Sequence, residues 1–565
     1  MTGSKGDWTL MTPVKRMFQL LKLEQKEVTS IYFYAVLSGL FQLAIPLGIQ
    51  AVINFVLAGT LSTSMVVLIA MVVIAVFLSG FLQVNQMKII EKIQQRIFAR
   101  YAFEFAWRIP KLDLQKTDGY YMPEFVNRFF DSVNLQKSLS KLLLDVPTAT
   151  IQVLFGLILL SLYANIFIIF SILTIIIIYI ILYRTSANGL TSSLEESDYK
   201  YQVAGWLEEV ARVLKSFRFS RLSTLPVDKT DEYVTNYIDA RTRHFKVLLV
   251  QYWSLIIFKV LITSSMLVVG GVLLVQNQIN VGQFVAAEIV ILTVLNSVEK
   301  LIQSLDKVYD VLTSIEKLGK VLDKPLEKTG TLALEQGEKG IQLSMQNVTF
   351  GYNDAYNVLS DISFDIPSGS KVCIMGSDGS GKSTLLRLFT GSYQQFEGNV
   401  LMNRVPIGNY DQDTLRARTG ILFHQQDIFQ GTIYENISLG DRSVTANQIL
   451  DVARKVGLES FIVSLKQGFD TPIDPAGKRL STGVIRKILL LRALISQPRL
   501  LLLEDPWLGY DEQDTERIKH YLLNETPEAT VMVAANDDDF ARKCDFVIEM
   551  ENGSIRRQGK PGDIL

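Results

Sequence analysis

Three long blocks without a charged side chain stand out in the N-terminal half of the chain. They run over Val28–Met87, Val146–Tyr183 and Val260–Ala287, and each is rich in Ile, Leu, Val and Phe. A helix that spans a bilayer needs about 20 apolar residues. Each block, together with its flanks, is therefore long enough for two such helices, and the pattern predicts six transmembrane helices embedded in a lipid bilayer.

Short breaks divide each block into a helical hairpin, and the charges around the blocks give its orientation. The breaks Ala58–Thr63, Tyr163–Asn165 and Gln276–Asn280 contain no Lys or Arg, whereas the segments Lys88–Lys141 and Arg184–Lys246 contain many. By the positive-inside rule, these basic segments and everything after the sixth helix lie in the cytoplasm. We therefore predict a multi-pass protein of the inner (plasma) membrane whose C-terminal half is cytoplasmic.

Local features refine this picture of the membrane half. Residues 1–27 precede the first helix, and Val14–Leu23 has an apolar and a basic face, which predicts a helix along the inner membrane surface. Pro46 is expected to kink the first helix, because proline lacks the N–H of a helical hydrogen bond. In the cytoplasmic segments, Lys116–Phe125 and Ala204–Val210 are candidates for short transverse helices that dock onto the C-terminal domain, with solvated loops as the alternative.

Glu288 is an isolated acid in the last hairpin, about 10 Å from its outer tip at the helical rise of about 1.5 Å per residue. Ionisable groups at such a depth usually face the interior of the helix bundle or a water-filled path. Glu288 is therefore a candidate for the substrate pathway. The alternative is a structural carboxylate that is paired between helices.

Composition adds limits to this reading of the chain. Of its 565 residues, 56 are Lys or Arg and 57 are Asp or Glu, so the balance of charge does not indicate a nucleic-acid partner. The two cysteines, Cys373 and Cys544, do not make a disulfide framework, and reduced cytosolic thiols are expected. The C-terminal half is long enough for one large α/β domain.

A glycine-rich loop in that C-terminal half carries the clearest chemistry. It matches the GxxxxGK[ST] pattern at every fixed position and consists of Gly376, Ser377, Asp378, Gly379, Ser380, Gly381, Lys382 and Ser383. Its backbone N–H groups can bind phosphate oxygens, Lys382 can reach the β- and γ-phosphates, and the Ser383 hydroxyl can ligate Mg²⁺. An apolar strand, Lys371–Met375, precedes the loop, and a helix that starts at Thr384 follows it. The loop predicts a site for ATP and Mg²⁺.

Further motifs follow in a set order, and with them the chain resembles an ABC exporter half-transporter over nearly its whole length. These motifs are Tyr352 after a strand, the glutamine-rich stretch Phe423–Ile437, the stretch Leu480-Ser481-Thr482-Gly483, and Leu500–Pro506, a buried strand that ends in two acids. The resemblance implies an α-helical transmembrane domain of six helices with long cytoplasmic extensions, residues 28–322. A linker, residues 323–339, leads to an α/β P-loop ATP-binding cassette domain, residues 340–565.

The resemblance also implies roles for individual residues. Tyr352 takes the place of the aromatic that stacks on adenine, and Gln425, with Gln426 as its rival, that of the glutamine that reaches Mg²⁺. Glu504 would hold Mg²⁺ and Asp505 would polarise the attacking water. The signature residues that meet the nucleotide across a dimer interface are Ser481, Thr482 and Gly483. Partners are then a second copy or a different half-transporter, and a periplasmic adaptor protein is left open.

Several positions depart from the family pattern. The family has Asp-Glu-Pro where this chain has Glu504-Asp505-Pro506, so the acid that polarises water is shorter by one methylene. Asn536 stands where the family has the switch histidine. In the signature, Thr482 replaces a glycine and Val484 replaces a glutamine. A misplacement of about 1 Å can cost roughly 10²-fold in rate, so ATP binding is expected to be intact and hydrolysis slow.

The sequence therefore predicts an ABC exporter half that works as a dimer by alternating access. The alternatives are a hydrolysis-impaired regulatory or binding-clamp subunit of a heterodimer, hydrolysis through a rearranged Glu504, and an ATP-gated channel or membrane scaffold. No motif in the chain indicates the substrate.

Overall fold

The computed structural model describes residues 12–59, 63–117, 119–186, 189–220, 223–334, 340–352, 356–424, 426–477 and 479–565. The chain divides into two compact units. The helical unit holds Met1–Lys111 and Tyr120–Lys324, and the cassette unit holds Pro325–Leu565 together with the short segment Leu112–Gly119. Each unit has its own core, and the two are described in turn.

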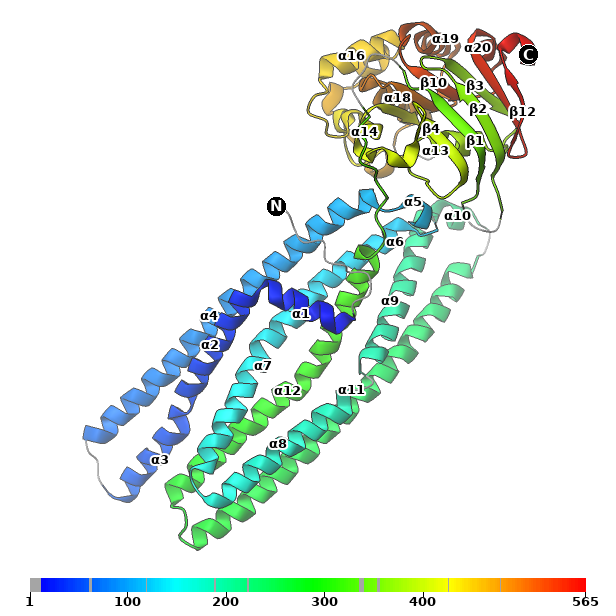
Figure 1. Ribbon diagram of the computed structural model, residues 1–565. Helices are drawn as coiled ribbons and strands as arrows, with labels where there is room; N and C mark the ends of the chain where they lie inside the picture. The colour runs from blue at the N-terminus through cyan, green and yellow to red at the C-terminus, as the bar shows by residue number, and fades with distance from the viewer. Residues whose placement is uncertain are drawn as a thin grey trace. The chain divides into compact units, whose positions relative to one another are not determined.

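Among the described residues, the helical unit contains six helices that are long and apolar enough to cross a membrane, which confirms the number predicted from the sequence. Helices α7 and α8 are separated at the predicted break Tyr163–Asn165, and α11 and α12 at Gln276–Asn280, whereas residues 60–62 of the predicted break Ala58–Thr63 lie outside the described residues. The helices of this unit (Figure 1) are α1 (Pro13–Leu23), α2 (Gln25–Gln42), α3 (Ala44–Leu57), α4 (Thr63–Arg108), α6 (Met122–Val126), α7 (Asp131–Ser161), α8 (Asn165–Ser186), α9 (Gly189–Arg212), α10 (Leu214–Phe219), α11 (Leu225–Val275) and α12 (Val281–Leu322).

The first membrane span is interrupted, as its proline predicts. Helix α2 ends at Gln42 and α3 begins at Ala44, with Leu43 between them. Pro46 lies in the first turn of α3 and has no N–H to donate to the carbonyl of Gln42. The interruption therefore follows from the missing hydrogen bond.

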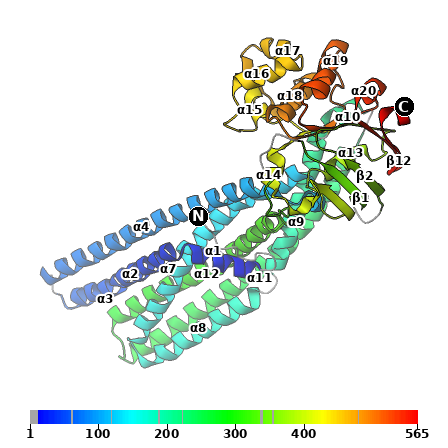
Figure 2. The same ribbon diagram turned by 45° about the horizontal axis from the view of Figure 1, so that its top comes forward.

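Helices α7 and α12 pack against each other along most of their length and lie side by side in the middle of the helical unit (Figures 1 and 2). Small residues make this close approach possible. A Cβ atom on Gly156 of α7 would lie 2.8 Å from Cγ2 of Val294 on α12, closer than real Cβ contacts. Val290 and Val294 are buried beside it. The apolar contact between α7 and α12 is thus part of the core of the unit.

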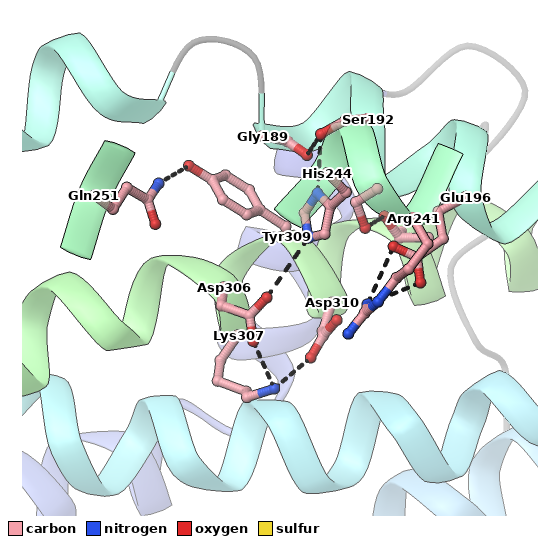
Figure 3. Close-up of polar contacts among 12 residues, drawn as sticks. Gly189, Ser192, Glu196, Arg241, His244, Gln251, Asp306, Lys307, Tyr309 and Asp310 are labelled. Carbon is pink, nitrogen blue, oxygen red and sulfur yellow. Dashed lines mark hydrogen bonds and ion pairs between the residues drawn. The ribbon is translucent and has the colours of Figure 1, made fainter. Parts of the chain in front are cut away.

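A polar network joins α9, α11 and α12 within the helical unit (Figure 3). The buried His244 ring on α11 has Ser192 Oγ 2.9 Å from its Nδ1 and Asp306 Oδ1 3.6 Å from its Nε2. Lys307 Nζ lies 2.9 Å from Asp306 and 2.7 Å from Asp310. This part of the unit is therefore held by charge and hydrogen bonding as well as by apolar packing.

The cytoplasmic segments differ in part from the sequence prediction. Ala204–Val210 does not form a separate transverse helix: it lies inside the continuous helix α9, and the short helix is α10, further along the chain. The ring of Trp206, which lies within this helix, packs against Phe217 and Tyr233, and its Nε1 donates to the carbonyl of Pro226 at 3.2 Å. The aromatic residue serves packing between helices of the same unit.

The first predicted transverse segment does contain short helices. Helix α5 (Leu114–Thr117) groups with the cassette unit, and α6 follows it in the helical unit. The Gln115 side chain of α5 accepts a hydrogen bond from the backbone N of Gln395 at 3.2 Å and donates to its carbonyl at 3.3 Å. Gln115 lies just before the predicted stretch Lys116–Phe125, so docking of that stretch itself stays a prediction, and Asp118 within it lies outside the described residues.

The described residues of the cassette unit form three sheets. A six-stranded sheet has the order β12-β11-β3-β10-β9-β6, a four-stranded sheet the order β2-β1-β4-β5, and β7 pairs with β8. The strands are β1 (Leu343–Phe350), β2 (Leu359–Ile366), β3 (Lys371–Gly376), β4 (Glu397–Met402), β5 (Val405–Pro406), β6 (Thr419–Leu422), β7 (Gly431–Thr432), β8 (Pro472–Ile473), β9 (Leu500–Glu504), β10 (Thr530–Ala534), β11 (Phe546–Glu551) and β12 (Ser554–Gly559).

The central strands of the larger sheet are parallel and buried on both faces. Strand β10 pairs in parallel with β3 and β9, and β9 with β6. Every residue of β9 and β10 is buried, which is why these strands are apolar runs without alternation. The helices of the unit besides α5 are α13 (Lys382–Leu388), α14 (Gln412–Ala417), α15 (Ile433–Ser438), α16 (Ala446–Lys455), α17 (Glu459–Val463), α18 (Thr482–Ile495), α19 (Glu512–His520), α20 (Asp538–Lys543) and α21 (Pro561–Ile564).

Both cysteines lie in the core of the cassette unit as free thiols. Burial raises the pKa of Cys373 to about 12, so this thiol stays protonated at neutral pH. The thiolate is the reactive form of cysteine. Cys373 therefore serves packing.

The packing of α7 on α12 gives a testable prediction. Gly156→Val should destabilise the protein by about 1–3 kcal/mol, because the new side chain overpacks the contact with Val294. Gly80→Val is the matched control, since a Cβ atom on this helical glycine of α4 meets nothing within 4 Å. Thermal unfolding of the purified protein in detergent measures both. Equal losses for the two variants would contradict the packing argument.

Candidate functional site

The phosphate-binding loop connects β3 to α13 with a backbone that glycine makes possible. Gly376, Gly379 and Gly381 have φ of 144°, 80° and 99°, a region that L side chains rarely adopt. A Cβ atom on Gly376 would also lie 2.3 Å from the carbonyl oxygen of Met550. The Lys382 side chain folds back over the loop, where its Nζ donates to the carbonyls of Gly376 and Ser377 at 2.6 and 2.8 Å.

A cavity of about 210 Å³ opens beside this loop. Most of the predicted phosphate-binding residues and both acids of β9 meet there. The residues that line it are Val358, Asp378, Gly379, Ser380, Gly381, Lys382, Ser383, Thr384, His424, Glu504, Asp505 and Ala534. The cavity thus combines a lysine, hydroxyls and backbone N–H groups with two carboxylates, which is the chemistry needed to bind a phosphate chain and a divalent cation.

Glu504 is the last residue of β9 and is almost fully buried, with 2% of its surface exposed. Its Oε2 accepts a hydrogen bond from the backbone N of His424 at 2.9 Å. Its Oε1 is buried and has no hydrogen-bond partner among the described residues. A buried carboxylate oxygen without a partner is costly, so this atom fits the ligand of a bound cation.

Asp505 follows directly and has a left-handed backbone, with φ of 40°. Its backbone N donates to the carbonyl of Ala534 at 3.0 Å, which fixes the turn after β9. Its Oδ2 lies 3.1 Å from Nε2 of His424. Strained backbone of this kind clusters at functional sites. The shorter acid is therefore held on one side by a histidine that the motif comparison did not single out.

Two predicted residues lie beside the loop rather than in the lining of this cavity. Asn536 follows β10, and its Oδ1 accepts a hydrogen bond from the backbone N of Gly376 at 3.0 Å. The Tyr352 ring packs edge-on against Phe350 and Tyr393, and its hydroxyl lies 3.2 Å from Oγ1 of Thr384.

Comparisons with known proteins find related cassettes and a shared fold. The ABC transporter family model matches residues 359–507. The chain is 25% identical to the putative multidrug export ATP-binding/permease protein YgaD of Bacillus subtilis, over 98% of this chain and 97% of that protein. It is 31% identical to the mitochondrial iron-sulfur clusters transporter ATM1 of Saccharomyces cerevisiae, over 40% of this chain and 33% of that protein.

A solved structure extends this likeness to both units of the chain. A bacterial Atm1-family ABC exporter with ATP bound superposes with a TM-score of 0.86 at 19% identity, over 96% of each chain. The fold, with six membrane helices and an α/β cassette, is therefore that of a solved exporter. Together the comparisons support an ABC exporter half-transporter. It drives ATP-dependent export, as predicted from the sequence.

The signature residues of the half-transporter lie apart from its own cavity. Ser481 caps α18, with its Oγ accepting from the backbone N of Val484 at 3.3 Å. Thr482 and Gly483 form the first turn of that helix. Ser481 and Thr482 are exposed, as expected of residues that would act in the site of a second cassette.

The glutamine predicted to reach the metal cannot be placed, because Gln425 lies outside the described residues. Its rival Gln426 turns back, and its Oε1 accepts from the backbone N of Phe423 at 3.0 Å. His424 lines the cavity of the half-transporter instead, and the sequence motifs did not predict it as a site residue. The pairing of Leu422 with Leu503 is the signal that indicates His424. Because these strand ends are paired in parallel, the residues that follow them meet at one edge of the sheet.

The geometry of the loop gives a prediction for nucleotide binding. Lys382→Ala should abolish the rise in unfolding temperature that Mg-ATP causes, because the variant loses the cation that reaches the β- and γ-phosphates. Differential scanning fluorimetry of the purified half-transporter measures it. Lys371→Ala, at the buried start of β3, is the control, and its nucleotide-dependent shift should persist. An unchanged shift in Lys382→Ala would show that this loop does not bind the nucleotide.

Proposed function

We propose that this half-transporter binds Mg-ATP between two cassettes and drives export mainly through ATP binding, with slow hydrolysis. The contrast between an intact phosphate-binding loop and the altered residues around it carries this proposal. The loop keeps every fixed position of the GxxxxGK[ST] pattern, whereas the acid after β9, the switch position and the signature all differ from the family pattern. Binding and hydrolysis depend on different groups, so one can weaken without the other.

The cavity of the half-transporter suits a magnesium ion that is bound mostly by the nucleotide. Ser383 and Glu504 would hold Mg²⁺, and the unpartnered Oε1 of Glu504 supports this assignment. No cluster of three or more His, Cys, Asp or Glu that could hold a metal exists among the described residues. That agrees with Mg²⁺, which is usually bound by one or two carboxylates, waters and phosphates. When bound, the ion neutralises charge on the phosphates.

Hydrolysis requires a water held in line with the γ-phosphate. The water oxygen bonds to phosphorus, the bond to the β–γ bridging oxygen breaks, and ADP leaves with that electron pair while the proton of the water passes to the phosphate. We assign Asp505 to polarise this water. Its side chain is one methylene shorter than the family glutamate, and Asn536 is engaged by the loop backbone. Both substitutions should slow the step.

The half-transporter has one phosphate-binding loop and one signature, so we infer that it works as a dimer. A homodimer would combine the same altered residues in both sites. A heterodimer in which this chain is the hydrolysis-impaired regulatory subunit is the second candidate, favoured by Thr482 and Val484 in its signature. We place the protein in the inner (plasma) membrane, cassette cytoplasmic, and an adaptor protein remains an open partner.

The names of the relatives cover different cargo, including drugs and iron-sulfur clusters. The residues that contact the cargo of this chain are therefore expected in its membrane half. Glu288 lies on α12, and its Oε2 is buried without a hydrogen-bond partner among the described residues. A paired structural carboxylate would have such a partner. The contrast favours Glu288 as a residue of the substrate pathway.

Glu288→Gln should change export more than folding, because the variant removes a charge without removing volume. Efflux of dyes from membrane vesicles, chosen because one relative is named as a multidrug export protein, and dye-stimulated ATPase activity measure the effect. Glu299→Gln on the same helix is the control, since Glu299 pairs with Lys259 at 2.6 Å and should affect stability instead. Loss of assembly in Glu288→Gln, with normal activity in the surviving protein, would support a structural role.

The altered catalytic positions predict a slow ATPase. A misplacement of about 1 Å costs roughly 10²-fold, which from the enzyme median of about 10 s⁻¹ gives a turnover on the order of 0.1 s⁻¹. Glu504→Asp, Asp505→Glu and Asn536→His together should raise the rate. Each change alone should do less, because groups that act on one transition state are not additive. Phosphate release in reconstituted membranes measures this.

The same triple variant with Lys382→Ala is the control and should be inactive. Turnover of about 1–10 s⁻¹ by the unmodified homodimer, close to the enzyme median, would show that the substitutions matter little. Loss of that activity on Glu504→Gln alone would then assign the water-activating role to Glu504. A rate that appears only when a second half-transporter is co-expressed would favour the heterodimer.

A further inference from the structure

A buried arginine joins the signature helix to the acid after β9. Arg486 lies on α18, and 9% of its surface is exposed. Its NH1 donates to the carbonyl of Asp505 at 2.7 Å, and its NH2 lies 2.6 Å from Nδ1 of His424. The guanidinium therefore contacts both residues that flank the cavity on this side. The sequence motifs assign Arg486 no role.

The arginine determines which nitrogen of His424 carries the proton. A guanidinium has only N–H donors, so Nδ1 of His424 must accept from it. In a neutral imidazole the proton is then on Nε2, which lies 3.1 Å from Oδ2 of Asp505. This nitrogen donates to the carboxylate. The tautomer is thus assigned from the hydrogen-bond network.

The same histidine is fixed through its backbone as well. Its N–H donates to Oε2 of Glu504 at 2.9 Å, directly after the end of β6. Backbone and side chain of His424 therefore contact the two neighbouring acids, one each. The ring can turn only by breaking its contacts with Arg486 and Asp505.

We propose that Arg486 and His424 are positioning residues for Asp505. Arg486 sets the tautomer and orientation of the His424 ring, and the ring holds the Asp505 carboxylate through Oδ2. The other oxygen, Oδ1, is left to polarise the attacking water. The Asp505 side chain is one methylene shorter than glutamate, and its carboxylate is oriented by the hydrogen bond from the His424 ring. This inference rests on the proposed role of Asp505 in hydrolysis.

The tautomer can be tested without any hydrolysis. The chain has three histidines, so ¹⁵N-histidine labelling of the full-length protein gives few signals, and His424→Gln identifies the one in question. The expected signature is a neutral ring with its proton on Nε2. Arg486→Met should convert it to a mixture of tautomers. Lys487→Met should not, because it removes the next cation on α18, which pairs with Asp514 of α19. A His424 signal that is the same in Arg486→Met as in the unmodified protein overturns the proposal.

The functional test separates positioning from binding. His424→Ala and Arg486→Met should each lower kcat on the order of 10-fold or more, because the carboxylate loses its orientation, while KM for ATP hardly changes. Arg486→Met should cost less in a His424→Ala background than alone, since the arginine acts through the histidine. Lys487→Met again serves as the control. An unchanged kcat in His424→Ala, or full additivity of the two losses, overturns the proposal.

These outcomes can be told apart from failure of the proposed function. Ordinary turnover by the unmodified protein, together with the expected tautomer and the expected loss in His424→Ala, would contradict slow hydrolysis and keep the positioning residues. Arg486→Lys gives a further check. It keeps the charge and loses the paired geometry, so it should restore little of the kcat lost in Arg486→Met.

Discussion

The ATP site depends on the parallel pairing of four strands in the cassette unit. Because β3, β10, β9 and β6 run in the same direction, their carboxyl ends meet at one edge of the sheet. The phosphate-binding loop, Asn536, Glu504 and His424 each follow one of these strands. The strands β9 and β10 are buried throughout, so Glu504 is a carboxylate at the end of an apolar run. Its burial is tolerated because one oxygen accepts a backbone N–H and the other faces the cavity.

Binding and hydrolysis are carried by different parts of this edge. The groups that we propose to bind phosphate are the backbone of the loop, Lys382 and Ser383, and they belong to one continuous segment. The groups that we propose to act on water come from the ends of other strands. A change of one methylene at Asp505 leaves the strand and its turn intact, because the turn is fixed by the backbone contact with Ala534. Substitution can therefore weaken hydrolysis without disturbing the fold or the affinity for nucleotide.

The sequence predicted what depends on short-range pattern. Charge-free blocks gave the six helices and their turns, and the spacing of glycines and Lys382 gave the loop between β3 and α13. Contacts between segments that are distant in the sequence could not be predicted from such short-range patterns. His424 and Arg486 are 62 residues apart and meet only because β6 and α18 belong to the same unit. The second transverse helix was misplaced for a related reason, since Trp206 is used for packing against distant aromatic residues.

The helical unit has two kinds of contact, and they respond differently to a change of conformation. The contact between α7 and α12 is apolar and closely packed, with Gly156 against Val294, so separating it leaves a void that costs free energy. The network of His244, Asp306 and Lys307 joins α9, α11 and α12 by polar groups, which can exchange their partners for water at a net cost of about 1 kcal/mol per hydrogen bond. Alternating access requires that some contacts persist while others open. We therefore expect α7 and α12 to move as one body, and the contacts of α9 and α11 with α12 to be those that change.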